Sequence, residues 1–531
     1  MTGREKLQGV EEHRKRLFQG GGPREVERQH GLGKLTARER LEKLFDPGSF
    51  QEMNLWIRPI RTGFDVDERE MPGDGVITGF GQVHGRPIYA YAHDFTVLGG
   101  AQSLGQQHKV AQVMEKALEA RVPCVGMIDS GGIKVHDLFG RPARRPILDG
   151  DGMGFAYGMF PMVPLNSGVI PQVSLMIGPC YAGSAYSPIM ADFVIMRKGT
   201  SYMSVASPPL LKAATFIDVT QEEIGGATLH ATVTGSCDVL SENDEEAVLS
   251  CRKLLTYLPL NNAQKPPVVD TGDDPNRREE SLLELVPADL SHPYDMHEVI
   301  ERVVDKGSLM ELQALFAQNL IIGFARLAGH TVGIVANNPA VKGGALDTNT
   351  CDKQTRFVRF CDAFGIPLVI LVDTPGFLSD AEQEKSREGL LRHAARPTFA
   401  LCEATVPRVV VHIGKCFGTA RLIMGTLRMG VDRVYAWPIS QVAKIDPERA
   451  VDQIYGKEIE AAPNPQAERE RRLQGLLKDY VRFPSHAGEY LMVEDIIDPR
   501  ETRPILVKTL NLLENKGTPT RPWRKHSLLP R

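Results

Sequence analysis

The sequence predicts an α/β protein of two similar domains, each built around a largely parallel sheet. Three observations lead to this prediction. Residues 77–132 align without a gap with residues 321–376, and 14 of the 56 paired positions are identical, whereas unrelated stretches share about 6% of positions. The 531 residues exceed the roughly 250 to 300 at which a single core stops growing. Each half also presents strand, helix and continuous apolar strand in succession, which is typical of βαβ units.

The expected elements follow the same order in both halves. Alternating apolar residues predict strands at 76–80 and 88–92, joined by a turn at 84–87. A helix follows at about 106–120 and a buried strand at 123–128. The second half repeats these elements at 322–324, 332–336, about 353–364 and 367–372. We expect an N-terminal domain at 1–270 and a C-terminal domain at 271–531.

Composition narrows the function classes. A formal net charge of -4 argues against a protein that holds nucleic acid by bulk electrostatics. The eight cysteines include no Cys-x-x-Cys pair, so we expect neither a zinc ribbon nor a disulfide framework, and no metal bound by this chain. The first thirty residues are charged and indicate a solvated amphipathic helix. No apolar run reaches the roughly 18 residues of a membrane helix, so we expect no membrane insertion and a cytoplasmic protein.

Both buried strands end in a polar turn that contains glycine. These turns are Asp129-Ser130-Gly131-Gly132 and Asp373-Thr374-Pro375-Gly376. Ligands of parallel sheets gather beyond the carboxyl ends of the strands, so the two turns are candidate walls of a site. A plain tight turn closed by an Asx hydrogen bond would need the same residues, and this alternative stays open.

A second pair of matched segments leads from a strand into a helix. Residues 177–183 (IGPCYAG) match residues 413–419 (IGKCFGT). Small residues at such a junction expose backbone N–H groups at a helix N-terminus, where a developing oxyanion can be held. Close packing of helix on strand needs the same residues, but the repetition within one chain favours the functional interpretation.

Taken in order, the motifs resemble those of one enzyme family nearly end to end. The matching runs are KLTARERL (34–41), DPGSF (46–50), DFTVLGG (94–100), SGVIPQ (167–172), EIGGA (223–227) with His230, CDAF (361–364), VDTPGF (372–377), EATVP (403–407) and AWP (436–438). The chain resembles the carboxyltransferase (beta) subunits of biotin-dependent acyl-CoA carboxylases, of the propionyl-CoA and methylcrotonyl-CoA type, and the related biotin-dependent decarboxylases.

This resemblance implies two tandem crotonase-like (ClpP/crotonase) ββα-superhelix domains. The N-terminal domain would bind acyl-CoA, and the C-terminal domain of a partner subunit would receive carboxybiotin. The implied reaction moves a carboxyl group between carboxybiotin and the α (or vinylogous γ) carbon of an acyl-CoA, through an enolate held by backbone oxyanion holes. The chain has no Ala-Met-Lys-Met motif and no ATP-grasp region. Biotin would therefore arrive on a partner carrier, with biotin carboxylase and biotin carboxyl carrier subunits as partners of a homo-oligomer, a hexamer in this family.

By position, the resemblance assigns the site residues. The catalytic backbone groups would be those of Ala182 and Gly183 for acyl-CoA, and those of Thr419 and Ala420 for biotin. The expected substrate-binding residues are Gly99, Gly100, Gly131, Gly132, Tyr181, Arg421 and Leu422. The expected biotin-binding residues are Gly343, Gly344, Gly376, Phe377, Phe417 and Gly418.

The departures from the family pattern lie near the chemistry. Ala182 and Thr419 stand in turns where the family usually carries Gly-Gly, and 445–448 (IDPE) replaces Met-Gly-x-Glu. Arg421 is a candidate for pairing with a second carboxylate on a dicarboxylic acyl-CoA; the alternative is a surface arginine bonded to a neighbouring carbonyl. Function also stays open between a carboxylase, a biotin-dependent acyl-CoA decarboxylase subunit and a non-catalytic paralogue in a carboxylase complex.

Overall fold

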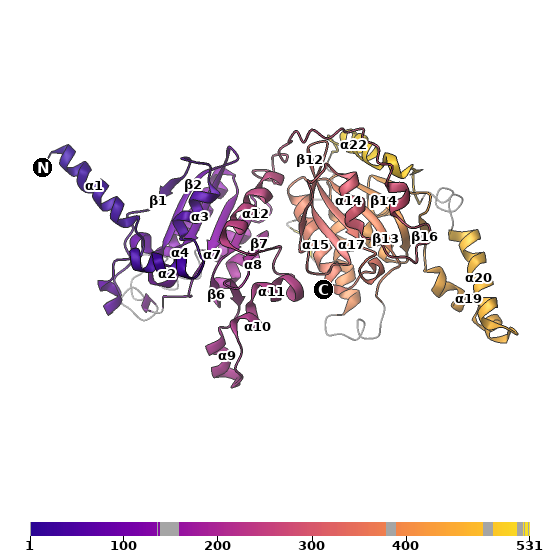
Figure 1. Cartoon of the computed structure of the whole chain (residues 1–531), viewed down its shortest axis with the longest axis horizontal. Helices are drawn as coiled ribbons and strands as arrows, with labels where there is room; N and C mark the ends of the chain where they lie inside the picture. Colours follow the sequence, from indigo (N-terminus) through magenta and orange to yellow (C-terminus); the bar gives the residue numbers. More distant parts are fainter. Residues whose placement is uncertain are drawn as a thin grey trace. The chain divides into compact units, whose positions relative to one another are not determined.

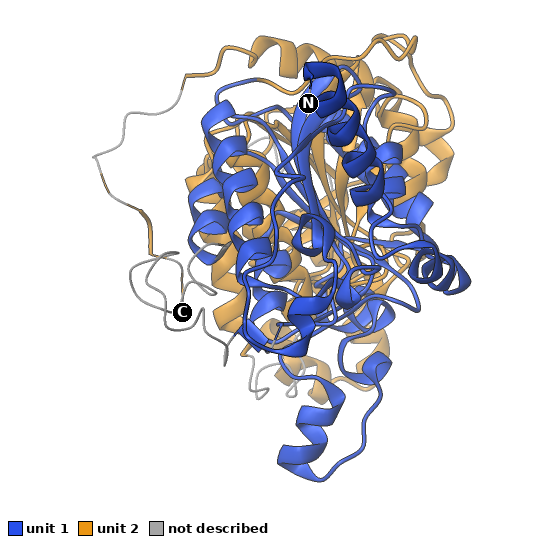
Figure 2. Ribbon diagram, turned by 90° about the vertical axis from the view of Figure 1, so that its left-hand side faces the viewer, with its two compact units in different colours: residues 1–264 blue, residues 265–531 orange. Residues whose placement is uncertain are grey.

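The computed structural model describes residues 2–134, 136–137, 159–378, 389–481, 492–517, 524, 526–528 and 530 (Figure 1). The chain divides into two compact units, unit 1 at Met1–Gln264 and unit 2 at Lys265–Arg531 (Figure 2). The sequence places the boundary slightly later, at 270/271. The shift arises because the backbone N–H of Val269 donates to the Gly329 carbonyl at 3.1 Å. The Arg326 side chain likewise donates to the Pro267 carbonyl at 3.1 Å.

Unit 1 contains a seven-stranded sheet in the order β1-β2-β3-β4-β5-β7-β9 within its described residues. The first three strands pair antiparallel, and the strands from β3 onward pair parallel. A separate two-stranded parallel sheet joins β6 to β8. The bounds are β1 Gln51–Met53, β2 Val76–Val83, β3 Arg86–His93, β4 Cys124–Ile128, β5 Gln172–Met176, β6 Pro179–Tyr181, β7 Phe193–Arg197, β8 Tyr202–Ser204 and β9 Val239–Ser241.

Unit 2 repeats this plan with an eight-stranded sheet among its described residues, in the order β10-β11-β12-β13-β14-β15-β17, with β16 also paired to β14. Pairing is antiparallel up to β12 and parallel beyond it. The bounds are β10 Met310–Leu312, β11 Leu320–Leu327, β12 His330–Asn337, β13 Leu368–Thr374, β14 Arg408–Phe417, β15 Arg433–Ala436, β16 Gln441–Ala443 and β17 Asp495–Ile496. The expected α/β class with parallel sheets is confirmed.

The duplication is visible in the element bounds. Strands β2 and β3 recur as β11 and β12 with every first and last residue displaced by 244 positions. The helices that follow, α4 (Leu104–Ala120) and α15 (Thr348–Ala363), also begin 244 residues apart. Both begin earlier than their apolar spacing predicts. The reason is a cap: the side chains of Ser103 and Asp347 each accept the backbone N–H three residues further on.

Helices of unit 1 pack on its sheet through their apolar sides. Val110, Val113, Met114 and Ala117 of α4 are buried in one cluster with side chains of β3, β4, β5 and β7. The N-terminal charged segment forms two helices and not one, and the first buries none of its side chains. The helices are α1 Gly3–Leu17, α2 Pro23–Gly31, α3 Ala37–Leu44, α4, α7 Met159–Asn166, α8 Gly183–Met190, α9 Pro208–Thr215, α10 Gln221–Gly225, α11 Ala227–Leu229 and α12 Asp244–Tyr257.

In unit 2, α14 and α22 share a buried cluster with β12, β13, β14 and Trp437. Helix α15 contacts β12 at Gly333, where a Cβ would lie 2.7 Å from the Cys361 Sγ. The helices are α13 Leu282–Leu285, α14 Met296–Val303, α15, α17 Leu390–Glu403, α18 Ala420–Met424, α19 Pro447–Ala461, α20 Pro465–Leu476 and α22 Thr502–Leu512. None of the helices in the described ranges is both long and apolar enough to span a bilayer.

Each unit fixes its first hairpin with an aspartate and an arginine. Asp46 accepts the backbone N–H groups of His84 and Gly85 at 3.1 and 2.8 Å. It also pairs with Arg252 of α12 at 3.0 Å. In unit 2, Asp305 accepts the N–H groups of residues 328 and 329 at 2.9 and 2.8 Å and pairs with Arg503 of α22 at 2.6 Å. These hairpins lie at the edge of the sheet opposite the carboxyl ends of the parallel strands.

Candidate active site

The duplicated glycine pairs lie against the ends of the buried strands. A Cβ on Gly100 would lie 2.2 Å from the Asp129 carbonyl oxygen, and a Cβ on Gly344 would lie 2.3 Å from that of Asp373. Both glycines have positive φ, 63° and 73°, a conformation that suits glycine. This close approach between backbones explains why each half keeps a Gly-Gly pair there.

Backbone bonds join each glycine pair to the turn beyond its strand. In unit 1, Gly131 N–H donates to the Gly99 carbonyl and Gln102 N–H to the Gly132 carbonyl, each at 2.8 Å. In unit 2, Leu346 N–H donates to the Gly376 carbonyl at 3.0 Å, and Leu346 forms a parallel bridge with Phe377. The expected residues of these turns are thus brought together in both units. Because Gly131 N–H is already engaged, this turn shapes the wall and does not supply a free donor.

The two strand-to-helix junctions are equivalent at an offset of 236 residues. Ala182 N–H donates to the Ser204 carbonyl at 3.1 Å, and Gly418 N–H donates to the Ala443 carbonyl at 3.2 Å. Both residues have positive φ, 54° and 62°. The N–H of Ala182 is therefore engaged within the protein, and its expected role as an oxyanion donor stays a prediction. Tyr181 precedes it at the end of β6, and burial raises the pKa of its phenol to about 12.

The next residue at each junction has a backbone N–H free to receive a ligand. Gly183 opens α8, and Thr419 directly precedes α18. Within the ranges that the structure describes, the N–H groups of Gly183 and Thr419 meet no hydrogen-bond acceptor. A Cβ on Gly183 would contact only the Phe160 ring, at 3.8 Å, so the approach to this N–H is open. Gly183 and Thr419 are thus equivalent donors, one in each unit.

A pocket of about 490 Å³ opens at the junction of unit 2. Five expected residues line it: Gly376, Phe377, Gly418, Thr419 and Leu422. Phe417 and Ala420 are buried beside it. Gly343 and Gly344 form the glycine pair that packs against the end of β13. Helix α17 adds an apolar wall, and the segment before α19 adds charge. Lys444, Asp446 and Arg449 all face this pocket, with Arg449 Nε 3.8 Å from the Asp446 carboxylate.

Arg421 is not among the residues that line this pocket. Its Nε atom is buried without a hydrogen-bond partner among the described residues. Burial, together with the smaller effect of the nearby Arg421 charge, lowers the pKa of His412 to about 3. Arg421 is thus half-buried near His412 of β14. The two alternatives for Arg421, pairing with a substrate carboxylate and a surface arginine bonded to a carbonyl, both stay predictions.

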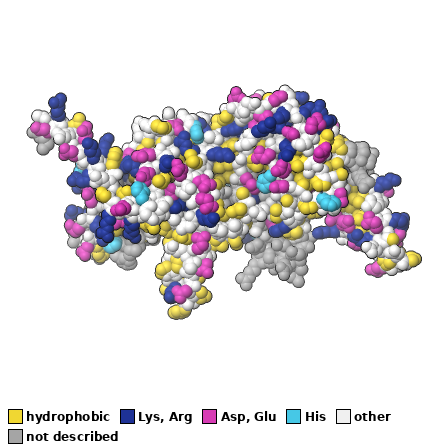
Figure 3. Space-filling model, in the orientation of Figure 1, with side chains coloured by type: hydrophobic (Ala, Val, Ile, Leu, Met, Phe, Trp, Pro, Cys, Tyr) yellow, Lys and Arg dark blue, Asp and Glu magenta, His cyan; other side chains and the backbone are white. Residues whose placement is uncertain are grey.

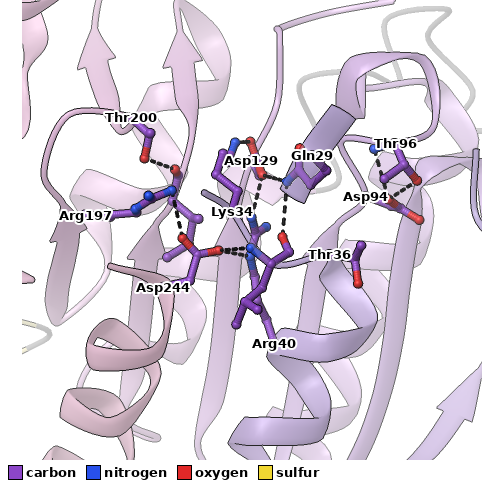
Figure 4. Close-up of polar contacts among 12 residues, drawn as sticks. Gln29, Lys34, Thr36, Arg40, Asp94, Thr96, Asp129, Arg197, Thr200 and Asp244 are labelled. Carbon is purple, nitrogen blue, oxygen red and sulfur yellow. Dashed lines mark hydrogen bonds and ion pairs between the residues drawn. The ribbon is translucent and has the colours of Figure 1, made fainter. Parts of the chain in front are cut away.

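Beneath the unit 1 junction, Asp129 is held in a buried ion network (Figure 4). Lys34 Nζ donates to one carboxylate oxygen at 2.6 Å, and Arg40 donates to the other at 2.9 Å. Arg40 also bonds Asp244 at 2.7 Å, and Asp244 lies 3.0 Å from Arg197. Burial favours the neutral acid, but the Arg40 and Lys34 charges outweigh it and lower the pKa of Asp129. The network ties α3 to the end of β4.

Asp373 occupies the equivalent place in unit 2, and no cationic side chain of the described residues is bonded to it. The Tyr294 hydroxyl donates to Oδ2 and the Lys415 backbone N–H donates to Oδ1, each at 2.8 Å. Burial raises the pKa of this carboxyl to about 6, and the two hydrogen bonds offset only part of that effect. Gly178 and Gly414 make room for the two aspartates, because a Cβ on either would lie about 2 Å from a carboxylate oxygen.

Sequence reasoning missed several of these residues. Lys34 and Arg40 belong to the family motif at 34–41, but their role as partners of Asp129 depends on contacts across 89 to 95 residues, which the motif does not reveal. Lys444 and Arg449 flank residues 445–448, where the sequence departs from the family motif. The change of charge in that motif is the sequence signal that points to these residues. Among the described residues, no group of three His, Cys, Asp or Glu side chains is arranged to hold a metal ion.

Comparison with known proteins gives consistent relatives over the whole length. Residues 28–529 match the family described as carboxyl transferase domain. The propionyl-CoA carboxylase carboxyltransferase subunit of Haloferax mediterranei is 39% identical over 532 residues, covering 100% of both chains. Methylmalonyl-CoA decarboxylase subunit alpha of Veillonella parvula is 40% identical, covering 100% of this chain and 99% of the relative. The transcarboxylase 12S crystal structure, a hexamer with methylmalonyl-coenzyme A bound, superposes with a TM-score of 0.93 at 39% identity, covering 100% and 99%.

Proposed function

The chain belongs to the carboxyl transferase domain family and is an acyl-CoA carboxyltransferase subunit, and we propose that it transfers a carboxyl group between carboxybiotin and acyl-CoA. The receiving atom is the α carbon, or the vinylogous γ carbon of an unsaturated chain. Relatives named for propionyl-CoA and methylmalonyl-CoA make short-chain thioesters the first substrates to test. The protein works in the cytoplasm as a homohexamer, with biotin carboxylase and biotin carboxyl carrier subunits as partners.

One observation carries this proposal: each unit presents a free backbone N–H at an equivalent helix start, on Gly183 and on Thr419. In unit 1, Gly183 N–H stabilises the thioester oxygen as the enolate forms, because a preorganised donor costs no reorganisation during the reaction. In unit 2, Thr419 N–H, with Ala420 beside it, receives the ureido carbonyl of biotin. Biotin itself supplies the transferable carboxyl group and the base.

The unit 2 pocket fits a bicyclic ureido ring in volume and in lining. It combines the donor Thr419 with apolar contacts from Leu422 and the α17 side chains. Pockets for small ligands are mostly apolar with a few convergent polar groups, and they exclude water from reactive intermediates. Neighbouring thiols do not compete as nucleophiles: burial raises the pKa of Cys180 to about 12 and that of Cys416 further.

The proposal is tested by exchange of carboxyl label between methylmalonyl-CoA and free biotin, without ATP or added metal. We expect exchange with the wild-type chain. Gly183→Pro deletes the proposed donor at the first helical position, where proline is well tolerated. Loss of one oxyanion donor lowers kcat about 100-fold or more. Gly183→Ala is the matched control, because it keeps the N–H and its Cβ has room.

Equal activity of the proline and alanine variants would remove Gly183 N–H from the mechanism. Failure of short, branched and dicarboxylic thioesters to exchange, with CoA binding intact, would instead favour the non-catalytic paralogue. A decarboxylase subunit is the second candidate, favoured by the Veillonella relative. It would catalyse the same exchange, and purification of the native complex would distinguish it by its partner subunits.

A further inference from the structure

A buried ion pair follows directly on the glycine turn of unit 1. Lys134 Nζ lies 3.0 Å from Asp137 Oδ1, and the two side chains are 1% and 2% exposed. Neither atom has a hydrogen-bond partner among the described residues, so charge alone holds them together. Figure 3 shows charged side chains of both signs spread over the surface in view, where water screens ion pairs. The Lys134–Asp137 pair is shielded from water and therefore carries a desolvation penalty that the surface pairs avoid.

The pair fastens the turn to the first residue of α4. Lys134 N–H donates to the Gln102 carbonyl at 2.9 Å, and Gln102 N–H donates to the Gly132 carbonyl at 2.8 Å. Asp137 Oδ2 accepts the N–H of Leu104, where α4 begins, at 2.9 Å. A carboxylate is favoured at a helix N-terminus. The ion pair therefore connects the start of α4 with the turn that forms a wall of the candidate site.

Two further carboxylates, Asp74 and Asp67, lie within the field of the Lys134 charge. Asp74 is 2% exposed and accepts the Ser103 hydroxyl at 2.5 Å. Burial raises the pKa of Asp74, and the Ser103 hydrogen bond and then the Lys134 charge oppose that rise. Burial also acts to raise the pKa of Asp67, but its hydrogen bonds and the Lys134 charge together lower that pKa below its ordinary value. One ammonium group thus acts on the carboxylates at 67, 74 and 137.

Unit 2 forms the same backbone crossing without a charge at this position. Leu346 N–H donates to the Gly376 carbonyl at 3.0 Å, and Leu378 N–H donates to the Leu346 carbonyl at 2.8 Å. These are the bonds of Gln102 and Lys134 displaced by 244 residues, with leucine at 378 where lysine stands at 134. Because the bonds form with either side chain, the crossing does not require the ion pair. What the charge adds is specific to unit 1.

We propose that Lys134 is a positioning residue for carboxyl transfer: its pairing with Asp137 holds the wall at Gly131 and Gly132 in one place relative to α4, so that the acyl group meets a wall of fixed shape. The inference rests on the proposed function, because it takes unit 1 as the acyl-CoA side of that reaction. Lys134 acts through the wall and not by contact with substrate, since its side chain is buried. A misplacement of about 1 Å that begins far from the reacting atoms can cost about 100-fold in rate.

Hydrogen exchange of the full chain tests the positioning without substrate. Lys134→Met leaves Asp137 without its cation. Asp137→Asn breaks the same pair but keeps an oxygen for the Leu104 N–H, so it tests the pair even where Lys134→Met does not fold. We expect the amides of Gly131 and Gln102 to exchange at least about tenfold faster in both variants, because the segment opens more readily once the pair is broken. Unchanged protection of these amides would overturn the inference.

Carboxyl label exchange with free biotin tests the effect on the reaction. Lys134→Met should lower kcat with methylmalonyl-CoA about tenfold or more, as a displaced wall would. It should also weaken the discrimination between methylmalonyl-CoA and ethylmalonyl-CoA, since a well-formed pocket distinguishes one methylene group by about tenfold or more. Lys134→Arg keeps the charge and should restore most of both properties. A pair that contributed only stability would change neither kcat per folded molecule nor this discrimination.

The matched control is Lys116→Met. Lys116 of α4 pairs with Glu119, three residues further on, with the same spacing as the Lys134–Asp137 pair, but its side chain is 42% exposed. Equal effects of the two Lys→Met variants on kcat and discrimination would overturn the inference, and so would a Lys134→Arg variant as impaired as Lys134→Met. Faster amide exchange in Lys134→Met, with no carboxyl exchange by the wild-type chain, would contradict the proposed function alone.

Discussion

The two halves hold equivalent buried aspartates with different partners. At the end of β4, Asp129 is paired with Lys34, which precedes α3, and with Arg40 of α3. At the end of β13, the carboxylate of Asp373 accepts, among the described residues, only from the Tyr294 hydroxyl and one backbone N–H. At the opposite edge of each sheet, by contrast, Asp46 and Asp305 keep the same arrangement of two hairpin N–H groups and one helix arginine.

This contrast separates what the duplication retained from what it changed. Both copies keep the interaction at the edge that closes the hairpin, and they differ at the carboxyl ends of the strands, where ligands of such sheets bind. Lys109 and Lys353 belong to the retained set: each is buried and donates to carbonyl groups before or at the start of the first long strand. The divergence thus concentrates where the two units are proposed to take different ligands.

The largest expected effect comes from breaking the unit 1 network. Arg40→Met leaves Asp129 and Asp244 buried with too few cations, and removal of one partner of a buried pair costs about 3–5 kcal/mol. Hydrogen exchange of β4 and β5 amides in increasing urea measures the loss within unit 1. Lys43→Met is the control, because the exposed Lys43–Glu245 pair contributes less than about 1 kcal/mol. Equal effects of the two variants would show that the network contributes no stability.

The same substitution should have opposite effects at the two aspartates. Asp373→Asn should raise the free energy of unfolding of unit 2 at pH 8 by up to about 3 kcal/mol, since the pKa is raised from 3.8 to about 6. Asp129→Asn should lower the stability of unit 1 at that pH, because Lys34 and Arg40 lose their charged partner. Unfolding followed unit by unit between pH 3.5 and 8 measures both.

The pH dependence follows from the sign of each shift. The Asp373 contribution is fully present below the unfolded pKa and is lost as pH rises through about 6, so the gain from Asp373→Asn should vanish near pH 4. The Asp129 contribution is present above the unfolded pKa and is lost as pH falls through its lowered folded pKa. Parallel pH profiles for the two variants would contradict the difference between the units.

The smallest expected effect is at the junction backbones. Ala182 holds φ 54° and ψ -135°, a conformation that costs a residue with a Cβ about 1 kcal/mol or more. Ala182→Gly should therefore raise the melting temperature of unit 1 slightly, and Gly418→Ala should lower that of unit 2 by a similar amount. A Cβ on Gly418 has no neighbour within 4 Å, so only backbone strain is tested. If the two substitutions changed the melting temperature in the same direction, side-chain packing and not backbone strain would determine the effect.

Much of the fold could be predicted because it follows local rules and repeats. Alternating apolar residues and the gapless offset of 244 locate β2, β3, β11 and β12 without any knowledge of tertiary contacts. Apolar spacing predicts helix starts at 106 and 353, which is too late, because the caps at Ser103 and Asp347 precede the first apolar residues of the pattern. The turn expected at Asp373 begins as the end of β13, since Thr374 still pairs with β14.

The candidate site was predictable in position and less so in detail. The order of residues along the chain predicts where the glycine pairs and both junctions lie. It cannot show that the Ser204 carbonyl accepts the N–H of Ala182. Arg421 follows Ala420 in sequence, yet it does not line the pocket, whereas Lys444 and Arg449 do. Such facts depend on contacts between distant segments, which no local pattern encodes.

The most direct test of the central claim is a pair of substitutions at Thr419. Thr419 has φ -75°, which proline can adopt, so Thr419→Pro removes the N–H with little other change. Thr419→Ala retains the N–H and removes only the side chain. Carboxyl label exchange between methylmalonyl-CoA and free biotin should fall about 100-fold or more in Thr419→Pro and stay near the wild-type rate in Thr419→Ala. Equal rates in the two variants, with CoA binding intact, would contradict the assignment of unit 2 as the biotin side.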